Sequence, residues 1–260
     1  MQSEDNQPGI LSIVSTGPGN IRQLTPAAMK TIAQADYIIG NDTYIDLIQS
    51  LIMGKKVIRS RMGEEVDRAQ KALDLAAAHR VVMVSGGDAG VYGMASIVIE
   101  VADRAGSLIH IEVVPGVTAA TAAASRLGSP LSGDYVTISL SDLLTPWDVI
   151  LDRLEHAFAM GVPVAIYNPR SRGRPHNLDA ALYIAQKHRN SETPVGVVKN
   201  AYRPGEETHV TTLDELRSDT SRVDMHSIVI IGGLESRIWK VGDDVRGIIT
   251  PRGYHRKYVY

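Results

Sequence analysis

Three glycine turns in the sequence could bind a ligand through backbone groups rather than through charged side chains. They occupy residues 17–19, 86–88 and 115–116, and each follows an apolar run of strand length. Glycine lets the backbone adopt positive φ and approach a ligand closely. The N–H and C=O groups of such turns can bind adenine, ribose hydroxyls or a carboxylate. Alternatively each turn only connects a strand to a helix, with Asp88 as a helix cap. The recurrence of glycine at several strand ends favours a binding site.

The first turn, Gly17-Pro18-Gly19, differs from known phosphate sites. It lacks the lysine of a phosphate-binding loop and the third glycine of a dinucleotide-binding motif. The turn therefore matches neither of these two phosphate-binding motifs.

A basic cluster, Arg170, Arg172 and Arg174, lies in the segment "YNPRSRGRP". Guanidinium groups bind carboxylates and phosphates through two parallel hydrogen bonds. The net charge of the chain is only -2, so this local cluster suits a polyanionic small molecule better than a nucleic acid. A solvated surface loop is the alternative. A second set of arginines could add to the cluster: Arg59, Arg61 and Arg68.

Other residue types exclude several kinds of site. The 260-residue chain has no cysteine, which removes disulfides, thiolate metal sites and cysteine nucleophiles. Its eight histidines show no metal-ligand spacing, so we predict no metal site. The sequence also lacks a phosphate-loop lysine motif, a zinc-protease motif and a serine-hydrolase motif.

Apolar runs of strand length alternate with longer amphipathic patterns along the chain. We predict strands at residues 10–14, 37–40, 56–58, 80–85, 109–114, 135–140, 162–167, 194–200, 209–211 and 227–231. We predict helices at residues 26–34, 42–52, 64–79, 96–105, 118–126, 147–159, 178–188 and 213–217. This order is typical of an α/β fold with mostly parallel or mixed sheets, in which ligands lie beyond the carboxyl ends of strands.

Two α/β domains are expected, joined near the Gly-, Ser- and Pro-rich stretch 128–134. The expected limits are a disordered tail at 1–9, an N-terminal domain at 10–128, a C-terminal domain at 134–248 and a C-terminal tail at 249–260. The first nine residues are polar and acidic, unlike a signal peptide, and no apolar stretch is long enough to cross a bilayer. We therefore expect a cytoplasmic protein that binds neither membrane nor nucleic acid.

The turns, taken in order, resemble the tetrapyrrole methylase family. Three longer segments, "SGGDAGVYGMA", "SLSDLLTPW" and "YNPRSRGR", resemble one branch of that family, whose members methylate C17 of precorrin-3B or cobalt-factor III. The last two segments are far more specific than a glycine turn. The resemblance extends over residues 10–254.

This resemblance implies two α/β domains with a cleft between them, and S-adenosyl-L-methionine as the cofactor, converted to S-adenosyl-L-homocysteine. The implied cofactor-binding residues are Pro18, Gly86, Gly87, Asp88, Val91, Thr118, Ala119, Asn168 and Ala201. Ala89 departs from the family pattern because it stands where proline is usual, and Asn20 stands where aspartate is frequent. Neither change removes a side-chain contact that we assign, so we still expect cofactor binding.

The implied reaction transfers a methyl group to C17 and contracts the ring of the tetrapyrrole, giving (cobalt-)precorrin-4. Methyl transfer requires mainly alignment of the reacting atoms. Proton movement during ring contraction calls for an acid or base, for which Asp142 is the first candidate and Asp88 the second; both could instead cap helices. The arginine cluster would bind the carboxylates of the substrate. The family also implies a homodimer.

Two alternatives remain open from the sequence. One is a methyltransferase that acts at another precorrin carbon or on another acceptor. The other is a nucleotide-binding sensor that uses the cleft without catalysis. The two longer motifs favour the C17 branch.

Overall fold

A computed structural model of the chain describes residues 9–259. The expected disordered tail, residues 1–9, lies outside the described residues except for Gly9. The chain forms two compact units, which divide between Ala119 and Ala120, before the stretch 128–134 in which we expected the junction. Each unit has its own sheet and its own core.

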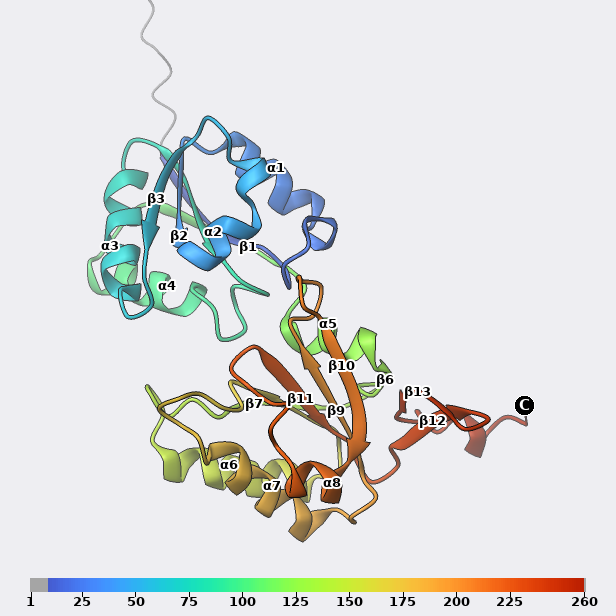
Figure 1. Ribbon diagram of the computed structural model, residues 1–260. Coiled ribbons are helices and arrows are strands. Elements are labelled where there is room, and N and C mark those ends of the chain that lie inside the picture. The colour runs from blue at the N-terminus through green and yellow to red at the C-terminus, as the bar shows by residue number, and fades with distance from the viewer. Residues whose placement is uncertain (1–8, 260) are drawn as a thin grey trace, which may run out of the picture. The chain divides into compact units, whose positions relative to one another are not determined.

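The first unit is built on a parallel sheet with the strand order β3-β2-β4-β1-β5 (Figure 1). Its strands are β1 (Ile10–Ser15), β2 (Tyr37–Asn41), β3 (Lys56–Ser60), β4 (Arg80–Ser85) and β5 (His110–Val114). Its helices are α1 (Pro26–Gln34), α2 (Asp42–Leu47), α3 (Glu65–Ala76) and α4 (Ala95–Arg104). Because β4, β1 and β5 are neighbours, the three glycine turns that follow them lie at one edge of the sheet.

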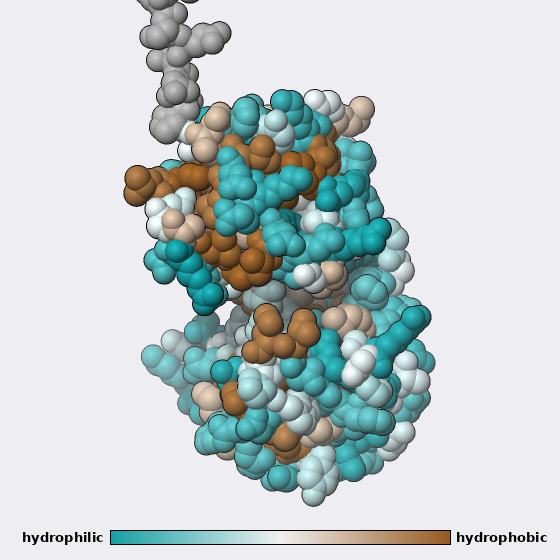
Figure 2. All heavy atoms as spheres, turned by 90° about the vertical axis from the view of Figure 1, so that its left-hand side faces the viewer, coloured by the Kyte–Doolittle hydropathy of each residue, from teal (hydrophilic) through white to brown (hydrophobic). Residues whose placement is uncertain are grey.

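Both faces of this sheet are buried, which explains why its strands are continuous apolar runs. Leu11 and Ile13 of β1 belong to a core that includes the apolar sides of α3 and α4. Val14 belongs to a second core, formed with α1 and α2. At the surface, Figure 2 shows apolar residues gathered on one face of the first unit. Val57, on the edge strand β3, is among the exposed apolar residues of this unit.

The second unit has a mixed sheet with the strand order β10-β9-β11-β8-β7. Its strands are β7 (Val136–Ser139), β8 (Val164–Tyr167), β9 (Pro194–Lys199), β10 (Glu207–Thr212) and β11 (Ser227–Ile231). Strand β7 is parallel to β8, and β11 is antiparallel to both β8 and β9, so β7, β8 and β9 end at the same edge. One core joins the sheet to α6 (Trp147–Ala159), α7 (Asn177–His188) and α8 (Leu213–Ser218) (Figure 1).

Helix α5 (Ala119–Arg126) leads into a small third sheet with the order β12-β13-β6. Its strands are β6 (Gly128–Ser129), β12 (Arg237–Val241) and β13 (Asp244–Ile249), none of which we predicted. Gly247 is required here, because a Cβ at this position would lie 2.3 Å from the carbonyl oxygen of Leu127. Short 3-10 helices complete the chain: η1 (Ile21–Gln23), η2 (Gln49–Leu51) and η3 (Tyr254–Arg256). No helix within residues 9–259 has the length and hydrophobicity needed to span a membrane.

Candidate functional site

The glycine turns of the first unit are bonded to one another at the carboxyl edge of the sheet. Gly17 and Gly87 pair through two backbone hydrogen bonds, with N···O distances of 3.0 and 2.8 Å. Asp88 joins the second turn to the third, because its Oδ1 accepts from Gly90 N (2.8 Å) and its Oδ2 from Gly116 N (2.9 Å). Both carboxylate oxygens of Asp88 therefore accept hydrogen bonds from backbone N–H groups. We call this connection between the second and third turns a brace.

Buried hydroxyl groups fix the segment after β4 in the same way. Ser15 Oγ accepts from Ala89 N (2.8 Å), and Ser85 Oγ accepts from Met94 N (3.2 Å). Thr16 Oγ1 donates to Ser85 O at 3.1 Å. Buried polar groups need such partners, and here they fix the segment without proline at position 89. We did not identify these hydroxyl residues from the sequence, although their position at strand ends was a signal.

The turns leave room only for glycine at two positions. A Cβ on Gly116 would lie 2.5 Å from Ser15 Cβ, and a Cβ on Gly86 would lie 2.1 Å from the ring of Tyr44. At Gly87, which has φ 64°, the nearest atom to an added Cβ is 3.7 Å away. The backbone of Gly87 is thus the more open of the three. No lysine or arginine occurs in these turns, so their donor set suits an uncharged or weakly charged ligand without phosphate, as a nucleoside joined to an amino acid would be.

The other predicted residues of this unit lie in or beside the same turns. Pro18 is buried next to Gly17, and Val91 N donates to Asp88 O at 3.2 Å. Thr118 and Ala119 are half-buried and follow Gly116 at the start of α5. The structure therefore brings the predicted residues of the first unit to one sheet edge.

In the second unit, two asparagines end strands β8 and β9 in the left-handed conformation. Asn168 and Asn200 both have φ 50°, a region that asparagine tolerates better than most residues. Asn168 Nδ2 donates to Ser139 Oγ at 2.8 Å, which links the ends of β8 and β7. Ala201 follows the second asparagine directly. Asn168 and Ala201 thus lie after two strands that end at the same edge.

Two arginines of the predicted cluster are engaged with backbone carbonyls and a carboxylate, mostly of other segments of the second unit. Arg174 Nη1 donates to Leu140 O (3.1 Å), and its Nε lies 3.7 Å from an oxygen of Asp142. Arg170 donates to backbone carbonyls at 3.0 and 3.1 Å. Arg172 is exposed. Arg170 and Arg174 therefore shape the loop, while Arg172 is the member presented to solvent.

The second set of arginines does not form a cluster with one purpose. Arg59 forms ion pairs with Asp46 (2.8 Å) and Asp42 (3.2 Å), which raise the pKa of its guanidinium above the usual value. Arg68 is buried and donates to Ser60 Oγ at 2.6 Å, and its Nε has no hydrogen-bond partner among the described residues. These side chains support the fold around β3 rather than present free charge.

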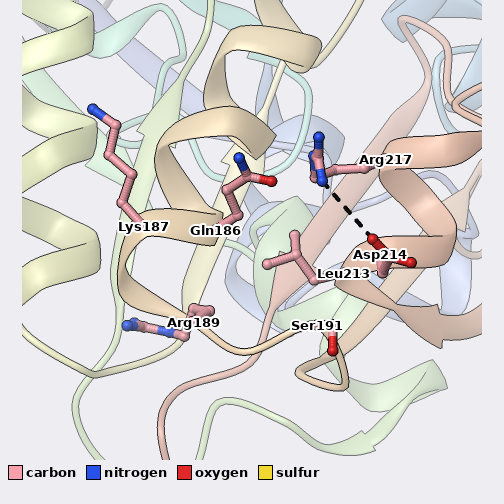
Figure 3. Close-up of a pocket in the computed structure, with 7 residues that line it drawn as sticks. All are labelled: Gln186, Lys187, Arg189, Ser191, Leu213, Asp214 and Arg217. Atoms are coloured by element: carbon pink, nitrogen blue, oxygen red, sulfur yellow. Dashed lines mark ion pairs between the residues drawn. The ribbon is translucent and has the colours of Figure 1, made fainter.

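A shallow pocket of about 300 Å³ lies elsewhere on the second unit (Figure 3). It is lined by Gln186, Lys187, Arg189, Ser191, Leu213, Asp214 and Arg217. Arg217 is paired with Asp214 at 3.8 Å. The guanidinium of Arg189 donates to backbone carbonyls, and its burial lowers its pKa. Several of its lining residues come just before β9 in the sequence, so the pocket lies at the edge of the sheet opposite to Asn168 and Asn200. We therefore do not assign it to the candidate site.

No group of three or more His, Cys, Asp or Glu residues within residues 9–259 is arranged to hold a metal ion.

Comparison with known proteins settles the family. The family described as Tetrapyrrole (Corrin/Porphyrin) Methylases matches residues 11–217. The chain belongs to the tetrapyrrole methylase family. The family that we predicted from the sequence is therefore confirmed.

Full-length relatives are similar over nearly the whole chain. The chain is 42% identical to the probable cobalt-factor III C(17)-methyltransferase of Salmonella typhimurium, over 94% of this chain and 99% of that protein. It is 44% identical to the cobalamin biosynthesis protein CbiHC of Archaeoglobus fulgidus, over 96% of this chain. The chain spans about half of that longer protein, 54% of its length.

A solved structure confirms the fold class. The crystal structure of the methyltransferase CobJ matches with a TM-score of 0.85 and 33% identity, over 94% of this chain and all of that chain. The expected α/β architecture with parallel and mixed sheets is thus the architecture of this family.

Proposed function

We propose that the chain is an S-adenosyl-L-methionine-dependent C-methyltransferase of cobalamin biosynthesis, which methylates C17 of cobalt-factor III or precorrin-3B with ring contraction. One observation carries the proposal: 42% identity over 99% of the Salmonella typhimurium protein that is named for this activity. The branch motifs "SLSDLLTPW" and "YNPRSRGR" support the same assignment. We further propose that the enzyme is a homodimer, as the family resemblance implies, and that it is cytoplasmic, as expected from the sequence.

The cofactor contacts proposed in the first unit are backbone groups. S-adenosyl-L-methionine supplies a methyl group on a positively charged sulfur. The turns around Gly17, Gly87 and Gly116 contain no cationic side chain that would repel such a sulfur, and carbonyl oxygens favour it. The proposed contacts are Pro18, Gly86, Gly87, Asp88, Val91, Thr118 and Ala119 in this unit, with Asn168 and Ala201 in the second unit.

For the substrate, we propose that the loop of Arg170, Arg172 and Arg174 binds carboxylates. Arg172 is exposed, and Arg170 and Arg174 hold the loop that presents it. Asp142 lies beside Arg174 and is the proposed acid or base for ring contraction, with Asp88 as the second candidate. The brace formed by Asp88 favours Asp142 for this role, because both oxygens of Asp88 already accept backbone hydrogen bonds.

Incubation with S-adenosyl-L-methionine and either cobalt-factor III or precorrin-3B tests the proposal. We expect the mass of one added methyl group and a changed absorption spectrum with at least one of the two substrates. Methylation of another precorrin, with neither of these two converted, would contradict the C17 assignment. Binding of the cofactor without turnover of any precorrin would instead favour a sensor.

A further inference from the structure

The turn after β9 holds two residues in an unfavourable backbone conformation. Asn200 has φ 50° and Tyr202 has φ 61°. The left-handed region is disfavoured for residues with a Cβ and is rare for a bulky aromatic residue. Such conformations persist only where neighbouring groups hold them, and they gather at functional sites. Ala201 lies between the two, at a position where we propose a cofactor contact.

Side chains at the end of α5 hold this turn in place. Glu206 Oε2 accepts hydrogen bonds from Tyr202 N (2.5 Å) and from Arg126 Nε (3.0 Å). The guanidinium of Arg126 lies over the ring of Tyr202, 3.9 Å from its centroid. The hydroxyl groups of Ser125 and Tyr202 are 2.8 Å apart. The last two residues of α5 therefore contact Tyr202, Arg126 at the face of the ring and Ser125 at the hydroxyl group.

This arrangement differs from an ordinary surface ion pair. An exposed pair alone contributes little to stability. Arg126 combines an ion pair with stacking on an aromatic ring, which its planar guanidinium allows, and the side chains of Arg126 and Glu206 are 37% and 27% exposed. Arg217 and Asp214, on α8, form an ordinary pair at 3.8 Å within one helix. The second pair provides a control for the first.

We propose that Arg126 is a positioning residue: through Tyr202 and Glu206 it holds the backbone of Ala201 in the conformation that binds the cofactor. This inference rests on the proposed function, since it requires that the chain binds S-adenosyl-L-methionine. Arg126 acts through its neighbours and does not itself contact the cofactor. Without it, the turn relaxes toward ordinary backbone conformations, and the binding-competent conformation becomes a minor one.

The test replaces Arg126 with methionine, which keeps the length of the side chain but removes its charge and its planar group. We expect S-adenosyl-L-homocysteine to bind R126M about tenfold more weakly by calorimetry, because affinity falls with the fraction of competent conformer. The KM for S-adenosyl-L-methionine rises by the same factor, and kcat changes by less than about twofold. Arg126→Lys restores part of the affinity. The control variant Arg217→Met binds S-adenosyl-L-homocysteine as the unaltered chain does.

Several results would overturn the assignment. One is an R126M protein whose affinity for S-adenosyl-L-homocysteine is unchanged, with or without a lowered melting temperature. Another is an equal loss of affinity in R217M. Should R126M fail to fold, Glu206→Gln tests the role of Arg126 instead. This substitution removes, at constant size, the negative charge that Arg126 and Tyr202 both contact, and it must also weaken the binding of S-adenosyl-L-homocysteine.

The outcomes separate this inference from the proposed function. If the unaltered chain does not bind S-adenosyl-L-homocysteine, the proposed function and the role of Arg126 both fail. If it binds the ligand but methylates no precorrin, the proposed methyltransferase activity fails, and the dissociation constant of R126M still decides the role of Arg126.

Discussion

At the scale of single residues, the carboxylate of Asp88 joins two backbone turns. Its two oxygens accept from Gly90 N and Gly116 N, and hydrogen bonds from backbone to a charged acceptor are among the stronger ones in proteins. The sequence suggested a cofactor contact, a helix cap or an acid for this residue. The geometry favours a brace between two turns.

Asp88→Asn distinguishes the brace from the acid. The amide nitrogen cannot accept a hydrogen bond, so one backbone N–H loses its partner, at a cost of about 1–2 kcal/mol. We expect a lower free energy of unfolding in urea and weaker binding of S-adenosyl-L-homocysteine. Asp142→Asn is the control, because the exposed side chain of Asp142 braces no turn. Unchanged stability and affinity in D88N, together with a lost kcat and an altered pH profile, would identify Asp88 as the acid.

The sequence indicated which turns lie together at the sheet edges better than it indicated the contacts of each side chain. The glycine turns were recognisable because glycine at strand ends has a local, steric cause. The roles of Arg170 and Arg174 were not recognisable, because their partners are backbone carbonyls of Pro175, Thr220 and Leu140. Two of these carbonyls belong to segments 34 and 50 residues away in the sequence, which meet the loop only in the folded chain, and composition carries no signal for such contacts.

At the scale of elements, the end of β9 is stabilised by charge. Lys199 Nζ lies 2.8 Å from Asp224 Oδ2, and His226 N donates to the other oxygen, Asp224 Oδ1. Burial opposes ionisation of Asp224, but the hydrogen bonds from Lys199 and His226 outweigh it, so the pKa of Asp224 is below its usual value. The hydrogen bond to Asp224 raises the pKa of Lys199. Since His226 O accepts from Asn200 N at 3.1 Å, this pair supports the turn that contains Ala201.

These two shifts predict a pH dependence for Asp224→Asn. Because the pKa of Asp224 is lowered in the folded chain, its carboxylate stabilises the fold above the unfolded pKa of about 3.9. This stabilisation is lost as the pH falls through the folded pKa. Because the pKa of Lys199 is raised in the folded chain, its ammonium group stabilises the fold below the unfolded pKa of about 10.4. This stabilisation is lost as the pH rises through the folded pKa. Urea unfolding should therefore show the largest difference between D224N and the unaltered chain between about pH 5 and 9. The side chain of Asp224 is 41% exposed, so solvent screening keeps this difference below about 1 kcal/mol. A difference that does not vary from pH 3 to 11 would contradict the prediction.

The segment between β7 and α6 presents two leucines to solvent. Leu143 and Leu144 are 83% and 93% exposed, and Arg174 and Asn177 hold the start of the segment by donating to Leu140 O. Under the proposed function, these apolar side chains would contact the flat ring of the tetrapyrrole while Arg172 binds a carboxylate.

Replacing both leucines with serine should alter substrate binding and not folding. Because the side chains are already in water, we expect the free energy of unfolding to change by less than about 0.5 kcal/mol. The KM for the tetrapyrrole should rise about tenfold, which corresponds to about 1.4 kcal/mol of lost contact, and the KM for S-adenosyl-L-methionine should stay constant. Leu108→Ser, at another fully exposed leucine, is the control. An unchanged KM for the tetrapyrrole would remove this segment from the substrate site.

Long amphipathic or buried elements were predictable, and short exposed ones were not. The limits of α1 and α6 agree with the predicted helices, because apolar spacing and the cap formed by Thr25 and Pro26 are local signals. Strand β12 reads "RIWKV" and is largely exposed, so it shows no alternating pattern. Strand β6 has two residues and exists only because β13 pairs with it. The predicted helix 42–52 is shorter in the structure, where α2 ends and η2 begins.

At the scale of the whole molecule, the chain's similarity to its relatives carries information that no single site does. Backbone turns without lysine or arginine suit a phosphate-free ligand, but they do not specify which carbon of which tetrapyrrole would be methylated. Two relatives that match the chain over nearly its full length, one of them about twice as long as the chain, narrow the choice of substrate. Binding of the cofactor, in contrast, can be tested on the chain without its substrate.

Binding of S-adenosyl-L-homocysteine should stabilise the folded chain by mass action. At a ligand concentration of about 100 times Kd, the expected gain is about 2.7 kcal/mol, which raises the melting temperature of a chain of this size by about 5–10 °C. NAD and ATP should have little effect, because their phosphates would meet turns without lysine or arginine. Gly116→Ala should abolish the shift, since its Cβ would lie 2.5 Å from Ser15 Cβ, whereas Gly173→Ala, with no atom within 4 Å of the added Cβ, should retain it. An equal shift with ATP or NAD would show that the turns accept phosphate after all, and a shift that persists in G116A would place the cofactor away from them.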